Sequence, residues 1–331
     1  MSKLLVTGGA GYIGGVVGAQ LVAAGHDVVV LDNLSTGHED GVPDGAGFVE
    51  GDIDDAAKVL DPSFDAVLHF AAKSLVAESV ARPELYWWNN AVGTLRLLDA
   101  MREHGVRRMV FSSTAAAYGE PETTPIREDA PAMPINPYGQ SKLAIDHALS
   151  GEAAAHGLAA VSLRYFNVGG ALGRHGERHD PETHLIPNVL AVPAGRRESV
   201  DVFGTDYPTR DGTAVRDYLH VEDLGRAHLL ALDWTGAASA SAVDGAGGGG
   251  GEHRIYNLGT GTGFTVREVI DAVRRVTGHP VPAVDRDRRA GDPPALVASA
   301  ERIGADLGWR AEHDLDRIVA DAWTFMQRGE Q

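Results

Sequence analysis

The stretch VTGGAGYIGG, residues 6–15, decides the fold of this chain. It places Gly8, Gly11 and Gly14 at three-residue intervals between a strand pattern (KLLVTGG, residues 3–9) and a helical pattern (residues 11–25). The first glycine permits a tight turn, the second lets the backbone approach a pyrophosphate, and the third allows close packing of helix on strand. A simple turn gives the same glycine pattern, but the flanking strand and helix favour a dinucleotide-binding unit.

A carboxylate closes the second strand pattern, DVVVLDN, residues 27–33. Asp32 can accept hydrogen bonds from a ribose diol and would repel a 2′-phosphate, so it predicts NAD rather than NADP. The alternative is a turn residue within LDNLSTG. Asp52, in EGDI after the third strand pattern, is placed to reach the adenine, although a lone aspartate there is also typical of a cap.

Strand and helix patterns alternate through the first half of the chain, which is typical of a parallel sheet. We expect an α/β fold with a Rossmann-type doubly wound parallel sheet over residues 1–168, to which some later segments return. Residues 169–331 should form mainly a smaller α/β lobe that binds the substrate. The low-complexity run TGAASASAVDGAGGGGGEH, residues 235–253, predicts a flexible surface insertion.

Composition narrows the possible functions. The chain has 331 residues, is 44% hydrophobic, carries a net charge of −17 and contains no cysteine. Disulfides, thiolate catalysis and cysteine metal sites are therefore excluded, and the charge disfavours a nucleic-acid partner. No run has the length of a membrane span, and residues 1–6 enter a strand pattern at once, so we expect a cytoplasmic protein without a leader. The 14 histidines show no metal-ligand spacing, and no metal is predicted.

A second motif, PYGQSKLAID at residues 137–146, places Tyr138 four residues before Lys142. On a helix these two side chains share one face. An exposed helix turn is one interpretation. The other is a phenol that acts as a base, which requires a nearby cation and a desolvated pocket.

The two motifs together, Thr-Gly-x-x-Gly-x-x-Gly and Tyr-x-x-x-Lys, resemble the extended short-chain dehydrogenase/reductase superfamily. The resemblance implies that Tyr138 is the base, and that Lys142 lowers its pKa and binds the nicotinamide ribose. It also implies a hydroxyl residue at the end of the fifth strand. In FSSTAAAYG, residues 111–119, the aligned residue is Thr114, with Ser112 and Ser113 as alternatives.

Over nearly the whole chain the sequence resembles the UDP-glucose 4-epimerase family. The most specific match is DYPTRDGT…VRDYLHV, within residues 206–221. Ala115 and Ala116 stand where the related dehydratases carry an acidic pair, so the elimination acid is missing. Further matching segments are HFAAKSLVAESV, NNAVGTLRLLDAM, LRYFNVGGA, YNLGTGTGFTVREV and RRAGDPPALVAS.

The resemblance implies interconversion of UDP-galactose and UDP-glucose through a 4-keto sugar, with NAD bound throughout. The implied cofactor-binding residues are Gly8, Gly11, Tyr12, Ile13, Gly14, Asp32, Asn33, Asp52, Ile53, Phe70, Ala71, Lys73, Asn89, Tyr138, Lys142 and Tyr165. The implied substrate-binding residues are Thr114, Tyr138, Asn167, His184, Leu185, Phe203, Arg216, Arg289, Asp292 and Leu296.

Three positions depart from the family pattern. Some members have a lysine where this chain has Ser74, with Lys73 one position earlier, and an asparagine in place of His184. At Leu296, small residues admit N-acetylated sugars and a tyrosine restricts them, so this specificity stays open. A UDP-glucuronate enzyme and a non-catalytic NAD-binding regulator are the alternatives.

The family also implies a homodimer, paired through the helix with the Tyr–Lys motif and the long helix before the fifth strand. Apolar positions that could serve this pairing, or could instead pack on the sheet, are Leu95, Leu98, Leu143 and Ala144.

Overall fold

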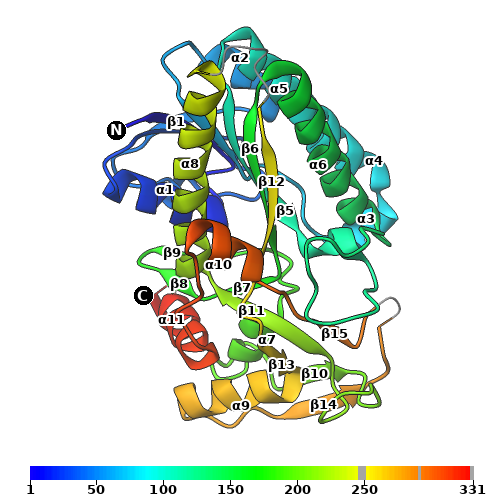
Figure 1. Cartoon of the computed structure of the whole chain (residues 1–331). Coiled ribbons are helices and arrows are strands. Elements are labelled where there is room, and N and C mark those ends of the chain that lie inside the picture. Colours follow the sequence, from blue (N-terminus) through cyan, green and yellow to red (C-terminus); the bar gives the residue numbers. More distant parts are fainter. Residues whose placement is uncertain (245–250, 290–291, 329–331) are drawn as a thin grey trace.

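The computed structural model describes residues 1–244, 251–289 and 292–328, which form a large and a small lobe (Figure 1). The large lobe is built on a seven-stranded parallel sheet with the order β12-β6-β5-β4-β1-β2-β3. This order confirms the doubly wound sheet, with β1 and β4 at the point where the winding reverses. The strands are β1 Lys3–Thr7, β2 Asp27–Asp32, β3 Gly47–Glu50, β4 Ala66–His69, β5 Arg108–Thr114, β6 Ala159–Tyr165 and β12 His253–Leu258.

Helices cover both faces of this sheet, and its strands are accordingly apolar on both sides. In β1, Leu4 and Val6 pack with residues of α1 and α8, whereas Leu5 packs with residues of α5 and α6. The helices on the first face are α1 Tyr12–Ala23, α8 Val221–Asp244 and α10 Glu301–Leu307. Those on the second face are α2 Ala56–Val59, α5 Gly93–Glu103 and α6 Pro137–His156.

Between β4 and α5 the chain forms α3 Val76–Ala81, α4 Pro83–Tyr86 and a π-helical segment, Trp87–Val92. Leu98, one of the positions considered for a subunit contact, is buried in the core under α5, so that role for it is wrong. Leu95, three residues earlier on the same helix, is exposed. Three residues of a helix with about 3.6 residues per turn fall short of a full turn by roughly 60°, which places Leu95 at the margin of the face that Leu98 buries.

The small lobe has its own core, formed by residues of α7, α9, α11, β10 and β11. Helix α9 begins with a reciprocal capping box between Thr265 and Glu268 and ends at Gly278, as its amphipathic sequence predicts. The elements are β7 Asn167–Gly169, β8 Ala171–Leu172, β9 His175–Gly176, α7 Leu185–Leu190, β10 Val200–Phe203, β11 Val215–His220, β13 Gly263–Thr265, α9 Val266–Thr277, β14 Ala283–Arg286, β15 Ala295–Leu296 and α11 Leu315–Arg328.

The prediction of a flexible insertion at residues 235–253 is wrong at both ends of that range. Residues 235–244 continue α8, and His253 begins β12, while residues 245–250 lie outside the described residues. Alanine is the strongest helix former, and the prediction of a flexible insertion did not take this propensity into account. Tertiary contacts then hold this part of α8 on the sheet, because Arg108 of β5 donates to the hydroxyl of Thr235 at 3.2 Å and to the carbonyl of Leu232 at 2.8 Å.

None of the helices within the described ranges is both long enough and apolar enough to cross a membrane.

Candidate active site

The glycine loop lies where β1 and β4 part. Gly8 has φ +74°, and a Cβ there would lie 2.5 Å from the amide nitrogen of Ala71. A Cβ on Gly14 would lie 2.2 Å from the carbonyl oxygen of Gly8. Gly11 is the N-cap of α1 and leaves the first amides of the helix without a side-chain cap. Only glycine is accommodated at positions 8 and 14. The uncapped first amides of α1 point toward the place where the pyrophosphate of a dinucleotide would bind.

Asp32 is buried at the end of β2 and has two partners. Its Oδ2 accepts from the amide of Ala10 at 3.0 Å, and its Oδ1 accepts from the amide of Leu34 at 2.9 Å. The second bond is the turn contact that was the alternative interpretation, and the first ties the glycine loop to β2. Both expectations for this carboxylate are therefore compatible, because its remaining lone pairs can still accept from a ribose.

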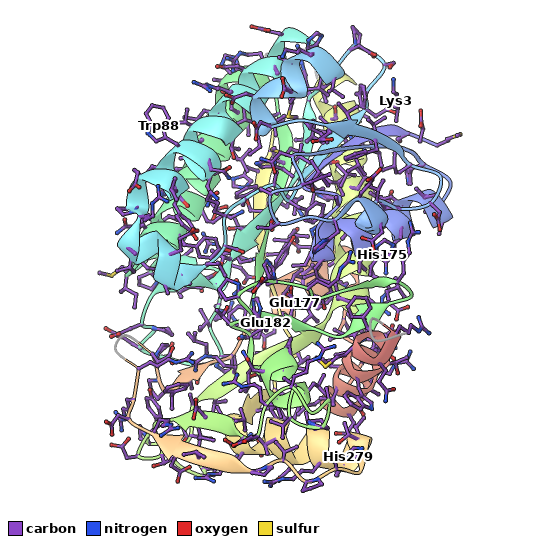
Figure 2. The ribbon with its side chains drawn as sticks, turned by 180° about the vertical axis from the view of Figure 1, so that it is seen from behind. Lys3, Trp88, His175, Glu177, Glu182 and His279 are labelled. Atoms are coloured by element: carbon purple, nitrogen blue, oxygen red, sulfur yellow. The ribbon has the colours of Figure 1, made fainter. Side chains whose placement is uncertain are left out.

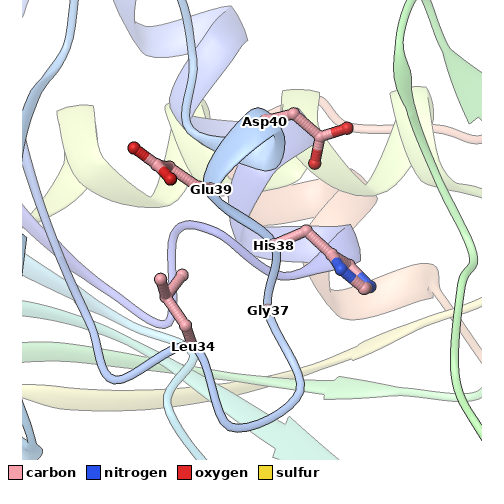
Figure 3. A pocket seen from close by; sticks show the side chains of 5 residues that line it. All are labelled: Leu34, Gly37, His38, Glu39 and Asp40. Carbon is pink, nitrogen blue, oxygen red and sulfur yellow. The ribbon is translucent and has the colours of Figure 1, made fainter.

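A hollow of about 620 Å³ opens beside Asp32. Its lining residues, drawn in Figure 3, are Leu34, Gly37, His38, Glu39 and Asp40. Nearby, the side chain of Asn33 donates to the carboxylate of Asp52, which joins the ends of β2 and β3. The structure thus brings together the residues expected around the adenosine half of the cofactor. Ile53, which follows Asp52, lies against Gly93 at the start of α5.

Tyr12 contacts the small lobe, whereas Tyr165 and Phe70 pack against the core of the large lobe. The Tyr12 hydroxyl donates to the carbonyl of Gly170 at 2.7 Å, so the first turn of α1 is fixed to the small lobe. The Tyr165 hydroxyl lies 2.5 Å from Nε2 of His228, whose ring is 5.0 Å from that of Phe70. Ile13 packs against the core beneath α1. Burial raises the pKa of both tyrosines, which stay neutral phenols.

Asn90, which was not among the predicted residues, organises the loop after β4. Its Oδ1 accepts from the amide of Lys73 at 2.8 Å, and its Nδ2 donates to the Lys73 carbonyl at 2.9 Å and to the Ser141 hydroxyl at 3.2 Å. The predicted Asn89 donates to Asn90 at 3.0 Å. Asn90 lies in the π-helical segment, and such segments are frequent at functional sites. The sequence signal that could have suggested this role is the second asparagine of NNAV, residues 89–92, which precedes an apolar helical pattern.

The backbone amide and carbonyl of Lys73 are both bonded to the side chain of Asn90. Within the described ranges its ammonium group makes no ion pair, so its charge is available. Ser74, the alternative position, is exposed.

Tyr138 and Lys142 lie in the first two turns of α6. The helix begins at Pro137, and Asn136 caps it by accepting from the amide of Gly139 at 2.8 Å. Lys142 is buried and donates to the carbonyl of Ser112 at 2.7 Å. Burial lowers the pKa of Lys142 to about 7, against the opposing effect of Asp146. The interpretation as an exposed helix turn is therefore wrong, since a buried lysine is costly without a purpose.

The hydroxyl at the end of β5 is Thr114. Burial raises the pKa of Tyr138, and the nearby side chain of Thr114 lowers it in part. Ser113 points to the other face of the sheet, where its hydroxyl donates to Asp146 at 3.3 Å. The side chain of Ser112 lies near Tyr165 instead. Strand alternation separates Ser113 from its two neighbours, and only Thr114 meets the tyrosine.

Arg216, Asp292 and Leu296 meet in the small lobe. Arg216 of β11 donates to the carboxylate of Asp292 at 3.3 Å and to the carbonyl of Pro293 at 3.0 Å. Leu296 pairs with Arg216 in the parallel register of β15 and β11. Asn167 lies on β7, which pairs with β11 at Tyr218. One strand therefore positions four of the residues expected to bind the substrate.

Two further pairs complete the expected substrate residues. The guanidinium of Arg289 lies 3.9 Å from the centre of the Phe203 ring, a stacked cation–π geometry. His184 is the N-cap residue of α7, and Leu185 is the first residue of that helix. Nδ1 of His184 lies 2.8 Å from Oε1 of Glu182, so this imidazole is already engaged by a carboxylate.

Comparison with known proteins agrees with this site. Residues 4–259 match the family described as "NAD dependent epimerase/dehydratase family", and the chain belongs to that family. The expected NAD-dependent fold is thereby confirmed.

Individual relatives narrow the class further. The chain is 58% identical to a UDP-glucose 4-epimerase of Streptomyces lividans over 97% of this chain and 95% of the relative. It is 54% identical to a UDP-glucose 4-epimerase of Corynebacterium glutamicum over 98% and 95%. A solved UDP-glucose 4-epimerase of Stenotrophomonas maltophila, with bound NAD and formylated UDP-arabinopyranose, is 37% identical, has a TM-score of 0.93 and covers 100% of this chain and 99% of its own.

Proposed function

We propose that this chain is a UDP-glucose 4-epimerase, an isomerase that interconverts UDP-galactose and UDP-glucose. The single observation that supports this most is the buried Lys142 one helical turn after Tyr138, bonded to the backbone of the β5 strand end that also carries Thr114. Ala115 and Ala116 follow Thr114, so the site lacks the acidic pair expected of a dehydratase. The names of the relatives at 54% and 58% identity support the same substrate.

Tyr138 would take the proton of the sugar 4-hydroxyl. Thr114 orients the phenol, and the ammonium of Lys142 stabilises the phenolate. The glycine loop and Asp32 would hold NAD, which when bound would supply the hydride acceptor and donor that the reaction at C4 needs. After the 4-keto sugar has turned over in the pocket, Tyr138 gives its proton back to the new hydroxyl.

Such a reaction needs a firm hold on the nucleotide and a loose hold on the sugar. Arg216 and Arg289 would supply the hold through charge-assisted bonds to the diphosphate, to which a planar guanidinium is well suited. Asp292, now paired with Arg216, would accept from the uridine ribose. Leu296, beside Arg216 in the register, would border the sugar and decide whether N-acetylated sugars enter.

Conversion of UDP-galactose by purified protein with no added NAD tests the proposal. Conversion of UDP-galactose to UDP-glucose, lost in Tyr138→Phe, would support the reaction and a cofactor that co-purifies. Conversion only after NAD is supplied would retain the chemistry but reject permanent NAD binding. Conversion of UDP-glucuronate or UDP-N-acetylglucosamine in place of UDP-galactose would assign another sugar, and no conversion of any of them would sink the proposal.

The assembly we propose is a homodimer paired through α3, α5 and α6. Large apolar side chains are exposed on α3 and on the π-helical segment before α5, with Val80 64% and Trp88 65% accessible, and Figure 2 shows Trp88 projecting outward from the helices. Trp87 and Leu95 extend the same surface at 40% and 47%. Contiguous exposed apolar groups favour a protein partner.

Light scattering after gel filtration tests this assembly. The expected mass is twice 34.9 kDa, falling to one chain in Trp88→Asp. Val284→Asp, at an exposed apolar position on β14, is the matched control and should stay dimeric. A wild-type protein that runs as one chain would refute the dimer. The cytoplasmic location stays a prediction, which cell fractionation tests.

A further inference from the structure

Four side chains that can bind metals gather in the segment between β9 and α7. They are Glu177, His179, Glu182 and His184, within eight residues of one another. Figure 2 shows Glu177 and Glu182 close together where the small lobe meets the large one. Apart from His184, none of them has a role in the proposed reaction.

Ligand atoms of three of them lie close together, and Glu182 contacts one of the three. Nδ1 of His184 lies 2.8 Å from Oε1 of Glu182 and 3.7 Å from Oε2 of Glu177, while Nδ1 of His179 contacts Oε1 of Glu177. Ligand atoms of Glu177, His179 and His184 all lie within 4.8 Å of one another. A tetrahedral zinc ion with bonds of about 2.0–2.1 Å holds its ligands roughly 3.3 Å apart, so only small side-chain shifts are needed.

The backbone holds the carboxylates in place before any ion arrives. Oε1 of Glu177 accepts from the amide of His179 at 3.0 Å, and Oε1 of Glu182 accepts from the amide of His184 at 2.7 Å. Each glutamate is thus fixed by the histidine two residues later. A fixed carboxylate loses less conformational entropy when it binds an ion.

The charge of the cluster depends on whether its two histidines are protonated. In the part of the chain that the structure describes, Glu177 and Glu182 form ion pairs with histidines alone. The neighbouring Arg178 is committed to Asp40 through two bonds of 2.9 Å. With neutral imidazoles the site therefore holds two negative charges, of which that of Glu177 is only 14% exposed. A divalent cation would neutralise them.

A hollow large enough for water adjoins one side of the cluster. Glu177 and His179 line a small cavity of about 40 Å³ beside the glycine loop. A space of roughly 10–15 Å³ is enough for one water molecule.

We propose that Glu177, His179 and His184 bind a divalent transition metal, with Glu182 as a fourth ligand. Two imidazoles and two carboxylates suit Zn²⁺, whereas Mg²⁺ and Ca²⁺ favour oxygen ligands throughout. The metal would fix the start of α7 and draw His184 to the carboxylates. It takes no part in the proton transfer at Tyr138. The proposal departs from the expectation, drawn from histidine spacing, that the chain has no metal site.

A second cluster, His220, Glu222 and His313, has ligand atoms equally close together. Its imidazoles are more fully committed, since Nδ1 of His220 accepts from the amide of Glu222 at 3.0 Å and Nδ1 of His313 lies 2.6 Å from Asp223. The first cluster is therefore the better site, and the second provides a control.

Titration of chelator-treated full-length protein with ZnCl₂ in a calorimeter tests the site, and it requires no enzymatic activity. We expect one ion per chain, with the Kd at least about 10- to 100-fold weaker in His179→Ala and in Glu177→Gln. His279→Ala changes an exposed histidine at the far end of the small lobe in Figure 2 and should bind as the wild type does. Circular dichroism would verify that each variant is folded.

The visible spectrum of the Co²⁺-loaded protein gives a second readout, because its d–d bands report imidazole and carboxylate ligation directly. Absence of saturable binding would overturn the proposal. So would unchanged affinity in both His179→Ala and Glu177→Gln, or loss of binding in His313→Asn with His179→Ala unaffected.

Discussion

The ammonium group of Lys142 lies 2.7 Å from the carbonyl oxygen of Ser112 and donates to it. This bond ties the second turn of α6 to the end of β5, and the ring of Phe111 lies 4.7 Å from the same nitrogen. The lysine is thereby held at the carboxyl edge of the sheet, beside Tyr138 and the glycine loop. Ligands of open α/β sheets bind at that edge.

Replacement of Tyr138 by phenylalanine should lower kcat by about 10²- to 10⁴-fold, the usual contribution of a positioned acid–base group. NAD should still be retained, because the variant loses only one hydroxyl. The rate of UDP-galactose conversion and the nicotinamide content of the purified protein are the measurements. Tyr86→Phe, whose ring is 6.3 Å from that of Tyr138, is the matched control and should keep most of the activity. Equal activity in the two variants would contradict the role of Tyr138.

Gly14→Ala should abolish cofactor retention, because its Cβ would lie 2.2 Å from the carbonyl of Gly8 and the loop would have to open. The NAD content of the protein after gel filtration measures the effect. Gly151→Ala in α6 is the matched control, since no atom lies within 4 Å of its new Cβ. That control should retain NAD and be about 1 kcal/mol more stable, through helix propensity. Full NAD content in Gly14→Ala would show that the loop does not hold the cofactor.

Asp217→Ala should reduce the free energy of unfolding by at least about 3 kcal/mol. The buried carboxylate accepts from the amides of Thr260, Gly261 and Ala298 at 2.8, 3.0 and 3.1 Å, and these donors would lose their partner. Urea unfolding followed by circular dichroism measures the change. Asp287→Ala, at an exposed position, should stay within about 0.5 kcal/mol of the wild type. A similar result for Asp217→Ala would mean that water replaces the carboxylate.

Protein stability should fall as the pH drops from about 6.5 to about 4, in part through His228. Burial lowers its pKa to about 4, below the value near 6.5 of an unfolded histidine. The folded state therefore binds fewer protons than the unfolded state across this window. The stability contributed by the neutral ring is complete above pH 6.5 and is lost as the pH falls through 4.

Thermal unfolding between pH 4 and 7.5 tests this contribution. His228→Gln should show a shallower loss of Tm with acid than the wild type, because the titrating ring is gone. His279→Gln, at an exposed position, should follow the wild-type curve. Parallel curves for His228→Gln and the wild type would rule out His228 as a source of the acid sensitivity.

Local patterns in the sequence predicted the positions of several residues of the candidate site. The glycine loop, Asp32 and the Tyr–Lys pair each depend on residues close together in the chain, where strand and helix periods fix relative positions. Asn90 was missed because its partners, Lys73 and Ser141, lie 17 and 51 residues away. Residues 235–244 were misread because the helix there depends on contacts with Arg108, which lies in a strand of the sheet.

By itself, the sequence determined the doubly wound sheet, the NAD-dependent class and the spacing of Tyr138 and Lys142, since these follow from periodicity and local steric limits. Tertiary structure decided which of three adjacent hydroxyls meets Tyr138, that Leu98 is core and Leu95 surface, and that Glu177 and His184 converge. These depend on which way each side chain points once the elements have packed. That direction is set by burial against residues distant in sequence, which no local pattern encodes.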